Sequence, residues 1–397
     1  MRGEWVNDPV VQRFREYLKI PSVHPDIDYG DCVVFLKQQA NEIGLPVTVY
    51  ELVPGKPIVV ITWTGLQPKD SSILLNSHMD VVPVYEEYWS HPPFEAVITD
   101  DGFLYGRGTQ DMKGVGMMHL ETIRRLKTAG VRLKRTIHMC FVPDEETGGT
   151  DGMRKFSESE VFKKLNVGFC LDESMPSSTD ALIAFNGERT SRQIKITCKG
   201  VPGHGSLLES NTAGEKLHYI VNKFMTLRAE EKKKLDNGAA LGEVTTINLT
   251  QTEGGVQINV LPENLSVSFD IRIAPEYDHD AFEKMITRWC KEAGDDVIFE
   301  YIVKNPEVKN TKIDGTVPFW NVIKTTVEKM GIVINCATCP GATDARYVRR
   351  QGVPAIGLSL MTNTLPLLHA HDERIHVQVY KRGIDIMEKI VLAVANV

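Results

Sequence analysis

Apolar and polar residues follow two patterns along the first half of the chain. Apolar positions recur at helical spacing in the stretches 8–44 and 113–130, and Gly130 is the expected end of the second stretch. A further helix is predicted at 152–165, and short apolar runs predict strands at 47–52, 58–63, 72–77, 136–143 and 167–172. Strands that alternate with helices are typical of a sheet covered by helices, so we predict an α/β domain with a mostly parallel sheet.

The pattern changes near Arg189. Alternating apolar residues predict strands at 192–199, 243–251, 264–273 and 297–303, and amphipathic spacing predicts helices at 213–235 and 280–294. The order β-α-β-β-α-β is that of a ferredoxin-like α+β module. After Pro306, helix and strand patterns return in "PFWNVIKTTVEKMG", "VINCATC" and "PAIGLSL". We therefore predict a catalytic domain formed by residues 1–187 and 306–397, interrupted by an inserted domain at residues 188–305.

Composition narrows the classes of protein. The length of 397 residues predicts two domains, and the net charge of −7 argues against a nucleic-acid binder, which needs a basic surface. No apolar run approaches the length of a membrane span, and the N-terminal "MRGEWVNDPVVQRFREYLKI" has no signal-peptide core. Seven scattered cysteines are typical of reduced thiols in the cytoplasm. Cys336 and Cys339 have zinc-ribbon spacing but no second pair, which favours a structural role.

Histidine and carboxylate residues stand where predicted strands give way to loops. His78 and Asp80 directly follow the apolar run "SILL". Other such positions occur in "YGRGTQDMKG", "FVPDEETGG", "FCLDES" and "LPLLHAHDER", namely Asp111, Glu145, Glu146, Asp172 and His369. Ligands of open α/β sheets collect at the carboxyl ends of the strands, so we expect these residues to converge there.

A set of imidazoles and carboxylates without cysteine suits two zinc ions that share a carboxylate, with cobalt or manganese as substitutes. Two divalent cations, three carboxylates and one hydroxide are neutral together, which lowers the cost of burying them. We predict that Asp111 bridges the ions. His78 and Asp172 would complete one ion, and Glu146 and His369 the other.

Two neighbouring carboxylates receive other roles. Glu145 lies next to a predicted ligand and is the candidate general base, which would move a proton from water to the leaving nitrogen. Asp80 would accept the ring N–H of His78 and so fix its tautomer.

Residue types and spacing alone leave other interpretations open. A histidine and an aspartate at the end of a strand are often a loop hydrogen-bond pair, and "DEE" is often a solvated acidic loop. "GRGTQD" lacks the third glycine of a dinucleotide-binding loop, and no GxSxG motif of a serine hydrolase is present. A pair of carboxylates acting alone, as in aspartic proteases or glycosidases, would leave the histidines without a role.

Six motifs in one order cover nearly the whole chain: "NSHMDVVPV", "GRGTQDMKG", "DEETGG", "FCLDES", "KGVPGHGS" and "LLHAHDER". Together they resemble the co-catalytic zinc hydrolases, a family that includes aminoacylases, metallodipeptidases, carboxypeptidases and desuccinylases. Longer stretches such as "SILLNSHMDVVPV" and "RTIHMCFVPDEETGG" are most similar to its aminoacylase members. The resemblance implies a cytoplasmic di-zinc amidase that cleaves N-acyl-L-amino acids, mainly N-acetyl ones. The alternatives are a metallodipeptidase or carboxypeptidase of the same family, and a non-catalytic binding protein that keeps the fold.

The resemblance also assigns roles in the predicted catalytic domain. His78, Asp111, Glu146, Asp172 and His369 match the metal-ligand positions, Glu145 matches the base and Asp80 the residue that orients His78. His369 is preferred to His371 because the family's ligand stands four residues before a glutamate, here Glu373. The resemblance further implies a cis peptide bond between Asp111 and Met112. Met79 departs from the threonine usual in close relatives, beside a ligand that is itself kept.

The inserted domain resembles the family's lid and dimerisation domain. His204 of "PGHGS" matches a histidine that reaches into the active site of a partner subunit and stabilises the oxyanion. Asn259 and Arg272 match residues that contact the substrate, and a guanidinium suits its carboxylate. Arg346 of "GATDAR" matches a loop that receives the same carboxylate. The resemblance therefore implies a homodimer with an active site completed across the interface.

Overall fold

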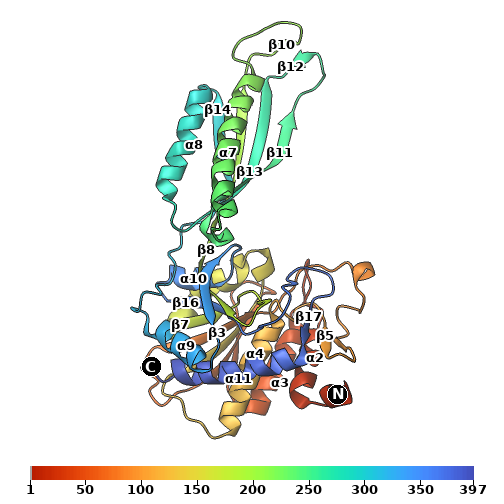
Figure 1. The fold of residues 1–397 in the computed structure, drawn as a ribbon, viewed down its shortest axis with the longest axis vertical. Coiled ribbons are helices and arrows are strands. Elements are labelled where there is room, and N and C mark those ends of the chain that lie inside the picture. Colours follow the sequence, from red (N-terminus) through yellow and green to blue (C-terminus); the bar gives the residue numbers. More distant parts are fainter. Residues whose placement is uncertain (1) are drawn as a thin grey trace. The chain divides into compact units, whose positions relative to one another are not determined.

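The computed structural model describes residues 2–397, which divide into two compact units (Figure 1). Unit 1 comprises the chain up to Asn186 together with Thr311–Ala337 and Thr343–Val397. Unit 2 comprises Gly187–Asn310 and the short stretch Thr338–Ala342. The predicted insertion at 188–305 begins one residue later and ends five residues earlier than the long segment of unit 2.

Unit 1 is built on an eight-stranded sheet with the order β1-β2-β6-β3-β7-β16-β8-β15. The central strands β6, β3, β7 and β16 are parallel, whereas β1, β2 and β8 pair antiparallel with their neighbours. This mixed and mostly parallel sheet confirms the predicted fold class. The strands are β1 (Val47–Glu51), β2 (Pro57–Trp63), β3 (Ser72–His78), β6 (Ile137–Val142), β7 (Val167–Asp172), β8 (Leu182–Glu188), β15 (Ile334–Cys339) and β16 (Ala355–Ser359).

Apolar side chains cover both faces of this sheet. On β3, Ile73 and Leu75 belong to the larger core cluster, whereas Leu74 belongs to a second cluster. Successive side chains of a strand point to opposite faces, so a strand buried on both faces is apolar throughout, as "SILL" is. The larger cluster includes residues of α2 (Pro9–Leu18), α3 (Gly30–Ile43), α4 (Lys113–Thr128), α9 (Pro318–Lys329) and α11 (Val377–Val394).

Shorter elements complete unit 1. The second cluster includes Phe156, Phe162 and Val348, which come from α5 (Lys155–Ser157), α6 (Glu160–Lys164) and α10 (Ala345–Arg350). A small sheet has the order β17-β5-β4. Its strands and the remaining short elements are β4 (Val97–Ile98), β5 (Phe103–Tyr105), β17 (Arg374–His376), α1 (Arg2–Val6), η1 (Glu86–Tyr88), η2 (Glu145–Thr147) and η3 (Thr150–Arg154).

The predicted helix at 152–165 is wrong, because the chain breaks there into three short elements. Gly152 has a non-helical backbone (φ −95°, ψ −112°), and a Cβ at this position would lie 1.9 Å from the main-chain oxygen of Pro143. Ser159 then starts α6 as an N-cap, since its hydroxyl accepts a hydrogen bond from the Phe162 N–H at 3.2 Å. Strand β8 was not predicted from the sequence.

Unit 2 has the predicted order β-α-β-β-α-β, with an antiparallel sheet of order β11-β13-β9-β14. Its core is separate from that of unit 1, and in it the rings of Phe224 and Phe269 stack at 4.2 Å. The elements are β9 (Thr190–Lys199), β10 (Gly203–His204), α7 (Ala213–Asp236), η4 (Leu241–Glu243), β11 (Thr246–Gly254), β12 (Val260–Leu261), β13 (Asn264–Ile273), α8 (His279–Ala293) and β14 (Val297–Lys304).

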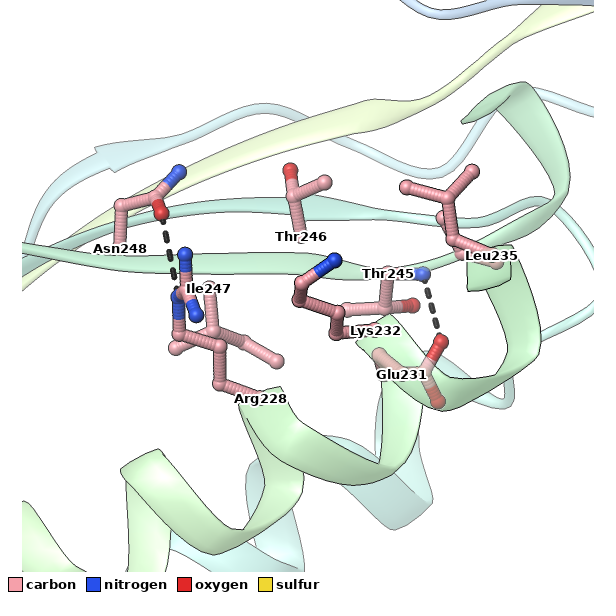
Figure 2. Close-up of a pocket in the computed structure, with 9 residues that line it drawn as sticks. Arg228, Glu231, Lys232, Leu235, Thr245, Thr246, Ile247 and Asn248 are labelled. Carbon is pink, nitrogen blue, oxygen red and sulfur yellow. Dashed lines mark hydrogen bonds between the residues drawn. The ribbon is translucent and has the colours of Figure 1, made fainter. Parts of the chain in front are cut away.

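A small pocket separates the end of α7 from the start of β11 (Figure 2). Two hydrogen bonds cross between these elements at the pocket. The Thr245 N–H donates to Glu231 at 2.8 Å, and Arg228 Nε donates to Asn248 Oδ1 at 3.4 Å. Both bonds join α7 to the segment that leads into and begins β11.

Two further findings concern the described residues as a whole. No helix among residues 2–397 is long and apolar enough to cross a membrane. None of the seven cysteines forms a disulfide within the part of the chain that the structure describes.

Candidate metal centre

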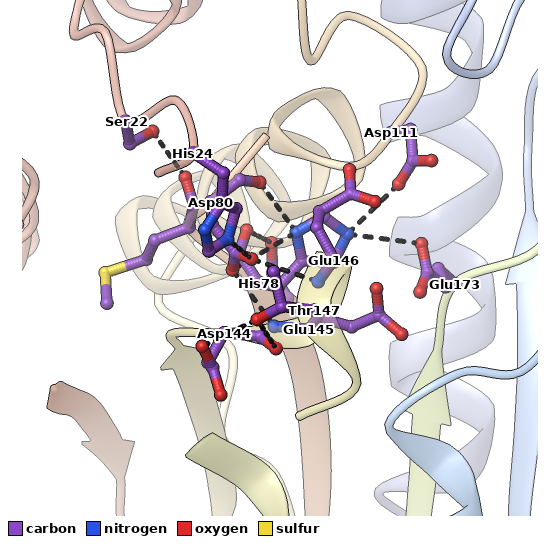
Figure 3. Close-up of polar contacts among 12 residues, drawn as sticks. Ser22, His24, His78, Asp80, Asp111, Asp144, Glu145, Glu146, Thr147 and Glu173 are labelled. Atoms are coloured by element: carbon purple, nitrogen blue, oxygen red, sulfur yellow. Dashed lines mark hydrogen bonds and ion pairs between the residues drawn. The ribbon is translucent and has the colours of Figure 1, made fainter. Parts of the chain in front are cut away.

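Three adjacent parallel strands bring the candidate residues together. Strand β3 lies between β6 and β7 and ends at His78. The loop after β6 carries Glu145 and Glu146, and Glu173 directly follows β7. Because the carboxyl ends of parallel strands meet at one edge of a sheet, these side chains face a common region (Figure 3).

His78 is fully buried and turns one ring nitrogen toward carboxylates. Its Nε2 lies 3.0 Å from Asp111 Oδ1 and 3.5 Å from Glu173 Oε2. Its Nδ1 lies 2.8 Å from the main-chain oxygen of Asp80, to which an Nδ1–H would donate. Burial disfavours the imidazolium, but the carboxylates of Glu173 and Asp111 outweigh it and raise the pKa of His78 well above its usual range. The carboxylates thus favour positive charge at the position that a cation would occupy.

Asp111 lies between two histidines, as a bridging ligand would. Its Oδ1 faces His78, and its Oδ2 lies 3.2 Å from His369 Nε2. The same His369 nitrogen is 3.0 Å from Glu146 Oε2. The hydrogen bonds to Asp111 and Glu146 raise the pKa of His369 to about 10. His369 is therefore in the cluster, whereas the ring of His371 lies 5.2 Å from that of Tyr88.

The cluster contains Glu173 where Asp172 was predicted. Ligand atoms that lie within 4.8 Å of one another form two groups, His78 with Asp111 and Glu146, and His78 with Glu145 and Glu173. Asp172 is in neither group, and its Oδ1 accepts a hydrogen bond from Asn76 at 3.0 Å. Side chains alternate along β7, so Asp172 shares a face with Cys170 of the second core cluster. In the sequence, the only indication that Glu173 could be a ligand was its position next to Asp172 in "DES".

The carboxylate of Asp80 holds the loop after β6. It accepts hydrogen bonds from the Glu145 N–H at 3.3 Å and the Glu146 N–H at 3.0 Å, and it lies 2.9 Å from His24 Nε2. Its nearest approach to the His78 ring is 3.8 Å. Asp80 therefore contacts the His78 N–H with its main-chain oxygen, while its side chain positions the two glutamates. His24 was not predicted from the sequence as a member of this site.

Glu145 has the surroundings of a proton-transfer group. Its carboxylate lies within 4.8 Å of ligand atoms of His78 and Glu173, and its side chain is buried (Figure 3). Burial raises the pKa of the Glu145 carboxyl well above its usual range, and the charge of Glu173 adds to this effect. A carboxyl group with a raised pKa can both accept a proton and give it back.

The loop that carries Asp111 is anchored by Glu373, which is completely buried. Its carboxylate accepts hydrogen bonds from Arg107 Nη1 at 2.8 Å, from the Gln110 N–H at 2.6 Å and from the Asp111 N–H at 3.2 Å. The peptide bond from Asp111 to Met112 is cis, as the resemblance implied. Glu373 thus ties the Asp111 loop to the segment that carries His369.

Three of the predicted substrate-site residues belong to unit 2. His204 is exposed on β10, and the neighbouring Gly205 N–H donates to the main-chain oxygen of Asn259 at 2.8 Å. Arg272 lies on β13 and pairs with Asp270 at 2.9 Å. Arg346 belongs to unit 1 and donates to the main-chain oxygen of Gly148 at 2.8 Å. Arg346 is therefore attached to the loop that carries Glu145 and Glu146.

The residues of the cluster fit a pair of divalent cations. Glu146 Oε1 is buried without a hydrogen-bond partner among the described residues. An unpaired buried oxygen is costly unless a cation or a donor satisfies it. Nitrogen and oxygen donors from two histidines and several carboxylates suit zinc and similar metals. The set that converges is His78, Asp111, Glu146, Glu173 and His369.

Comparison with known proteins identifies the family. The family model described as peptidase family M20/M25/M40 matches residues 74–393. The chain belongs to peptidase family M20/M25/M40. The chain is similar over its full length to aminoacylase-1 of Sus scrofa. The two are 46% identical, and the alignment covers 100% of this chain and 98% of the relative. Aminoacylase-1 of Homo sapiens is 45% identical, and the alignment covers 100% of this chain and 98% of the relative. Aminoacylase-1 of Dictyostelium discoideum is 41% identical, with 96% of this chain and 97% of the relative covered.

Solved structures show the M20 fold at low sequence identity. A metallo-carboxypeptidase from Sulfolobus solfataricus has a TM-score of 0.72 at 18% identity, covering 98% of this chain and 99% of that one. Aminopeptidase PepT from Bacillus cereus has a TM-score of 0.75 at 19% identity, covering 98% of each chain. The Bacillus subtilis YXEP protein, described as a dinuclear metal binding peptidase, has a TM-score of 0.66 at 15% identity. The match covers 99% of this chain and 98% of that one. These structures share the fold, and the family model together with the full-length relatives confirms the predicted resemblance to this family.

Proposed function

We propose that this chain is an aminoacylase, which hydrolyses the amide bond of N-acyl-L-amino acids to a carboxylate and a free amino acid. The similarity to aminoacylase-1 along the full chain carries this proposal, because it accompanies an intact cluster with a buried candidate base. N-acetyl amino acids are the expected main substrates.

The proposed cofactor is a pair of zinc ions, for which cobalt or manganese could substitute. His78 and Glu173 would hold one ion, Glu146 and His369 the other, and Asp111 would contact both. Asp172, which the sequence predicted as a ligand, is replaced by Glu173 in this assignment. When bound, the two cations would polarise the amide carbonyl and lower the pKa of the attacking water.

Glu145 is the proposed general base. Its carboxylate accepts a proton from water as the water attacks the amide carbonyl, and it then delivers that proton to the nitrogen of the leaving amino acid. The protein assists by fixing the main chain of Glu145 against Asp80, so that the carboxylate stays at the cluster. The burial of Glu145 and its place within 4.8 Å of ligand atoms of His78 and Glu173 support this role.

We further propose which residues contact the substrate, including one residue from a second copy of the chain. Arg272, Asn259 and Arg346 are proposed to bind the amino-acid carboxylate and the amide group. His204 is proposed to stabilise the oxyanion from the partner subunit of a homodimer. The exposure of His204 and Asn259 leaves both side chains accessible to such a partner. We also propose a cytoplasmic location, which the absence of disulfides among the described residues supports.

The test of the proposed function is the Glu145→Asp variant, assayed with N-acetylmethionine on zinc-loaded protein. The shorter side chain withdraws the base from the reacting atoms but keeps the charge, so we expect kcat to fall by about 10²–10⁴-fold. Elemental analysis should still find two metals per chain. The exposed Glu16→Gln variant is the control and should retain wild-type rates.

Substrate choice separates aminoacylase activity from its rivals. The wild-type enzyme should hydrolyse N-acetylmethionine faster than an unblocked dipeptide such as Ala-Met. Turnover of the dipeptide alone would show a metallodipeptidase. No turnover of either substrate by fully loaded protein would favour a non-catalytic binding protein.

A further inference from the structure

A histidine far from the predicted motifs lies against the candidate centre. His24 Nε2 is 2.9 Å from Asp80 Oδ2 (Figure 3). Asp80 is completely buried, whereas the side chain of His24 is 11% exposed. The His24 ring therefore lies between the buried Asp80 carboxylate and the solvent.

Main-chain hydrogen bonds fix this segment beside Asp80. The His24 N–H donates to the Val81 oxygen at 3.2 Å, and the Val81 N–H donates to the Ser22 oxygen at 2.8 Å. The Ser22 hydroxyl donates to the Met79 oxygen at 2.6 Å. Residues on both sides of Asp80 are thus bound to the segment, so the imidazole has a defined position.

His24 is the only side-chain donor to the Asp80 carboxylate among the described residues. The other donors are the N–H groups of Glu145 and Glu146, at 3.3 and 3.0 Å. A buried carboxylate that loses a hydrogen-bond donor is costly, so it is expected to shift toward its remaining donors or toward water. Any movement of Asp80 would be transmitted directly to the main chain of the candidate base and of a candidate ligand.

We propose that His24 is a positioning residue for amide hydrolysis. Its Nε2–H donates to Asp80, and Asp80 in turn holds the main chain of Glu145 and Glu146 at the cluster. His24 acts through Asp80 and contacts no reacting atom, and its role in turnover rests on the proposed function. The bond requires the tautomer with hydrogen on Nε2.

The test compares His24→Leu with His24→Gln in the zinc-loaded full chain. Leucine has no donor, whereas the glutamine amide nitrogen can take the position of Nε2. We expect kcat for N-acetylmethionine to fall about tenfold in H24L, with KM within about twofold of wild type. H24Q should recover kcat to within about twofold. His91→Leu, at a half-buried histidine whose ring contacts Tyr105, is the matched control and should leave both constants unchanged.

A second measurement is independent of the substrate. Hydrogen–deuterium exchange of the peptide containing Glu145 and Glu146 should be faster in H24L and unchanged in H24Q. If wild-type protein shows no turnover while this exchange pattern appears, the proposed function fails and the positioning role stands. Unchanged exchange and kcat in H24L, or equal losses in H24L and H24Q, would overturn the role of His24. If H24L does not fold, H24N replaces it, because the shorter amide does not reach Asp80.

Discussion

Two adjacent acidic residues at the end of β7, Asp172 and Glu173, have different surroundings although the sequence offers little to separate them. Glu173 lies 3.5 Å from the Nε2 of His78, whereas Asp172 accepts a hydrogen bond from Asn76 on the other side of the strand. A run of polar residues at the end of a strand does not reveal which carboxylate turns toward the neighbouring strand. The orientation depends on where pairing stops, which the long-range contacts of β7 with β3 and β16 decide.

This difference predicts opposite effects of two conservative substitutions. Glu173→Gln removes an anionic ligand, so elemental analysis should find close to one metal per chain after dialysis against a weak chelator. Asp172→Asn keeps an oxygen that can accept from Asn76, so it should retain two metals. Loss of metal in D172N with full loading of E173Q would restore Asp172 as the ligand.

Elements of unit 1 also bury histidines that have no part in the cluster. His119 on α4 has no hydrogen-bond partner for either ring nitrogen among the described residues, and burial lowers its pKa to about 3. His138 on β6 lies 2.9 Å from Thr62 Oγ1, and burial lowers its pKa to about 4. Both imidazoles are neutral in the folded chain at ordinary pH.

Neutral burial of His119 makes the stability of unit 1 depend on pH. In the unfolded chain a histidine has a pKa of about 6.5, so it binds a proton as the pH falls below that value. In the folded chain, His119 stays unprotonated until the pH falls to about 3. Because the unfolded state binds more protons, the free energy of unfolding decreases as the pH falls from 6.5 toward 3. At pH 5 this effect amounts to about 2 kcal/mol.

His119→Leu should remove this contribution. Urea unfolding at pH 7 and at pH 5 would measure the loss of stability between the two, and the loss should be about 2 kcal/mol smaller in the variant. His218→Gln, at an exposed position of α7, should show the same loss as wild type. An unchanged loss in H119L would mean that His119 is already protonated or solvated in the folded chain.

Elements with clear periodicity could be predicted, and those shaped by local breaks could not. The predicted ranges of β7 and β13 coincide with the observed strands, because alternating or continuous apolar residues there match their burial. The pattern at 152–165 is amphipathic, yet close contact of Gly152 with Pro143 and the cap at Ser159 override it. Local propensity is a weak guide where a long-range contact fixes the backbone.

The candidate site was predictable to the extent that its residues stand at strand ends. His78, Asp111, Glu146 and His369 could be identified in this way and by resemblance, and they converge. His24 and Glu373 could not, because each acts by a hydrogen bond to a residue distant in sequence. Only the folded chain shows which remote histidine or glutamate is buried against a ligand loop.

The division of the whole chain into two units was visible in the change of pattern near Arg189, but one part of it was not. Residues Thr338–Ala342 return to unit 2 after the chain has re-entered unit 1. Arg189 fixes this return, since its Nη2 and Nε donate to the main-chain oxygen of Pro340 at 2.7 and 3.0 Å. No feature of the sequence "CATCPGA" indicates an acceptor for an arginine so far away.

Separate cores predict that metal removal acts on one unit. The five converging ligands all belong to unit 1, and unit 2 has its own apolar core. A ligand that binds only the folded state stabilises by about 4 kcal/mol at a thousandfold excess over its Kd. Chelation should therefore lower the unfolding temperature of unit 1 by about 10 °C.

Hydrogen–deuterium exchange on heating, with and without EDTA, would locate the effect. Peptides from β3 and β6 should lose protection at lower temperature after chelation, because buried carboxylates such as Asp111 and Glu146 then repel one another without compensation. Peptides from α7 and β13 should keep their unfolding temperature, and added zinc should restore β3 and β6. An equal shift in all four elements would show that the two units unfold as one, and no shift in any of them would show that the cluster does not hold metal.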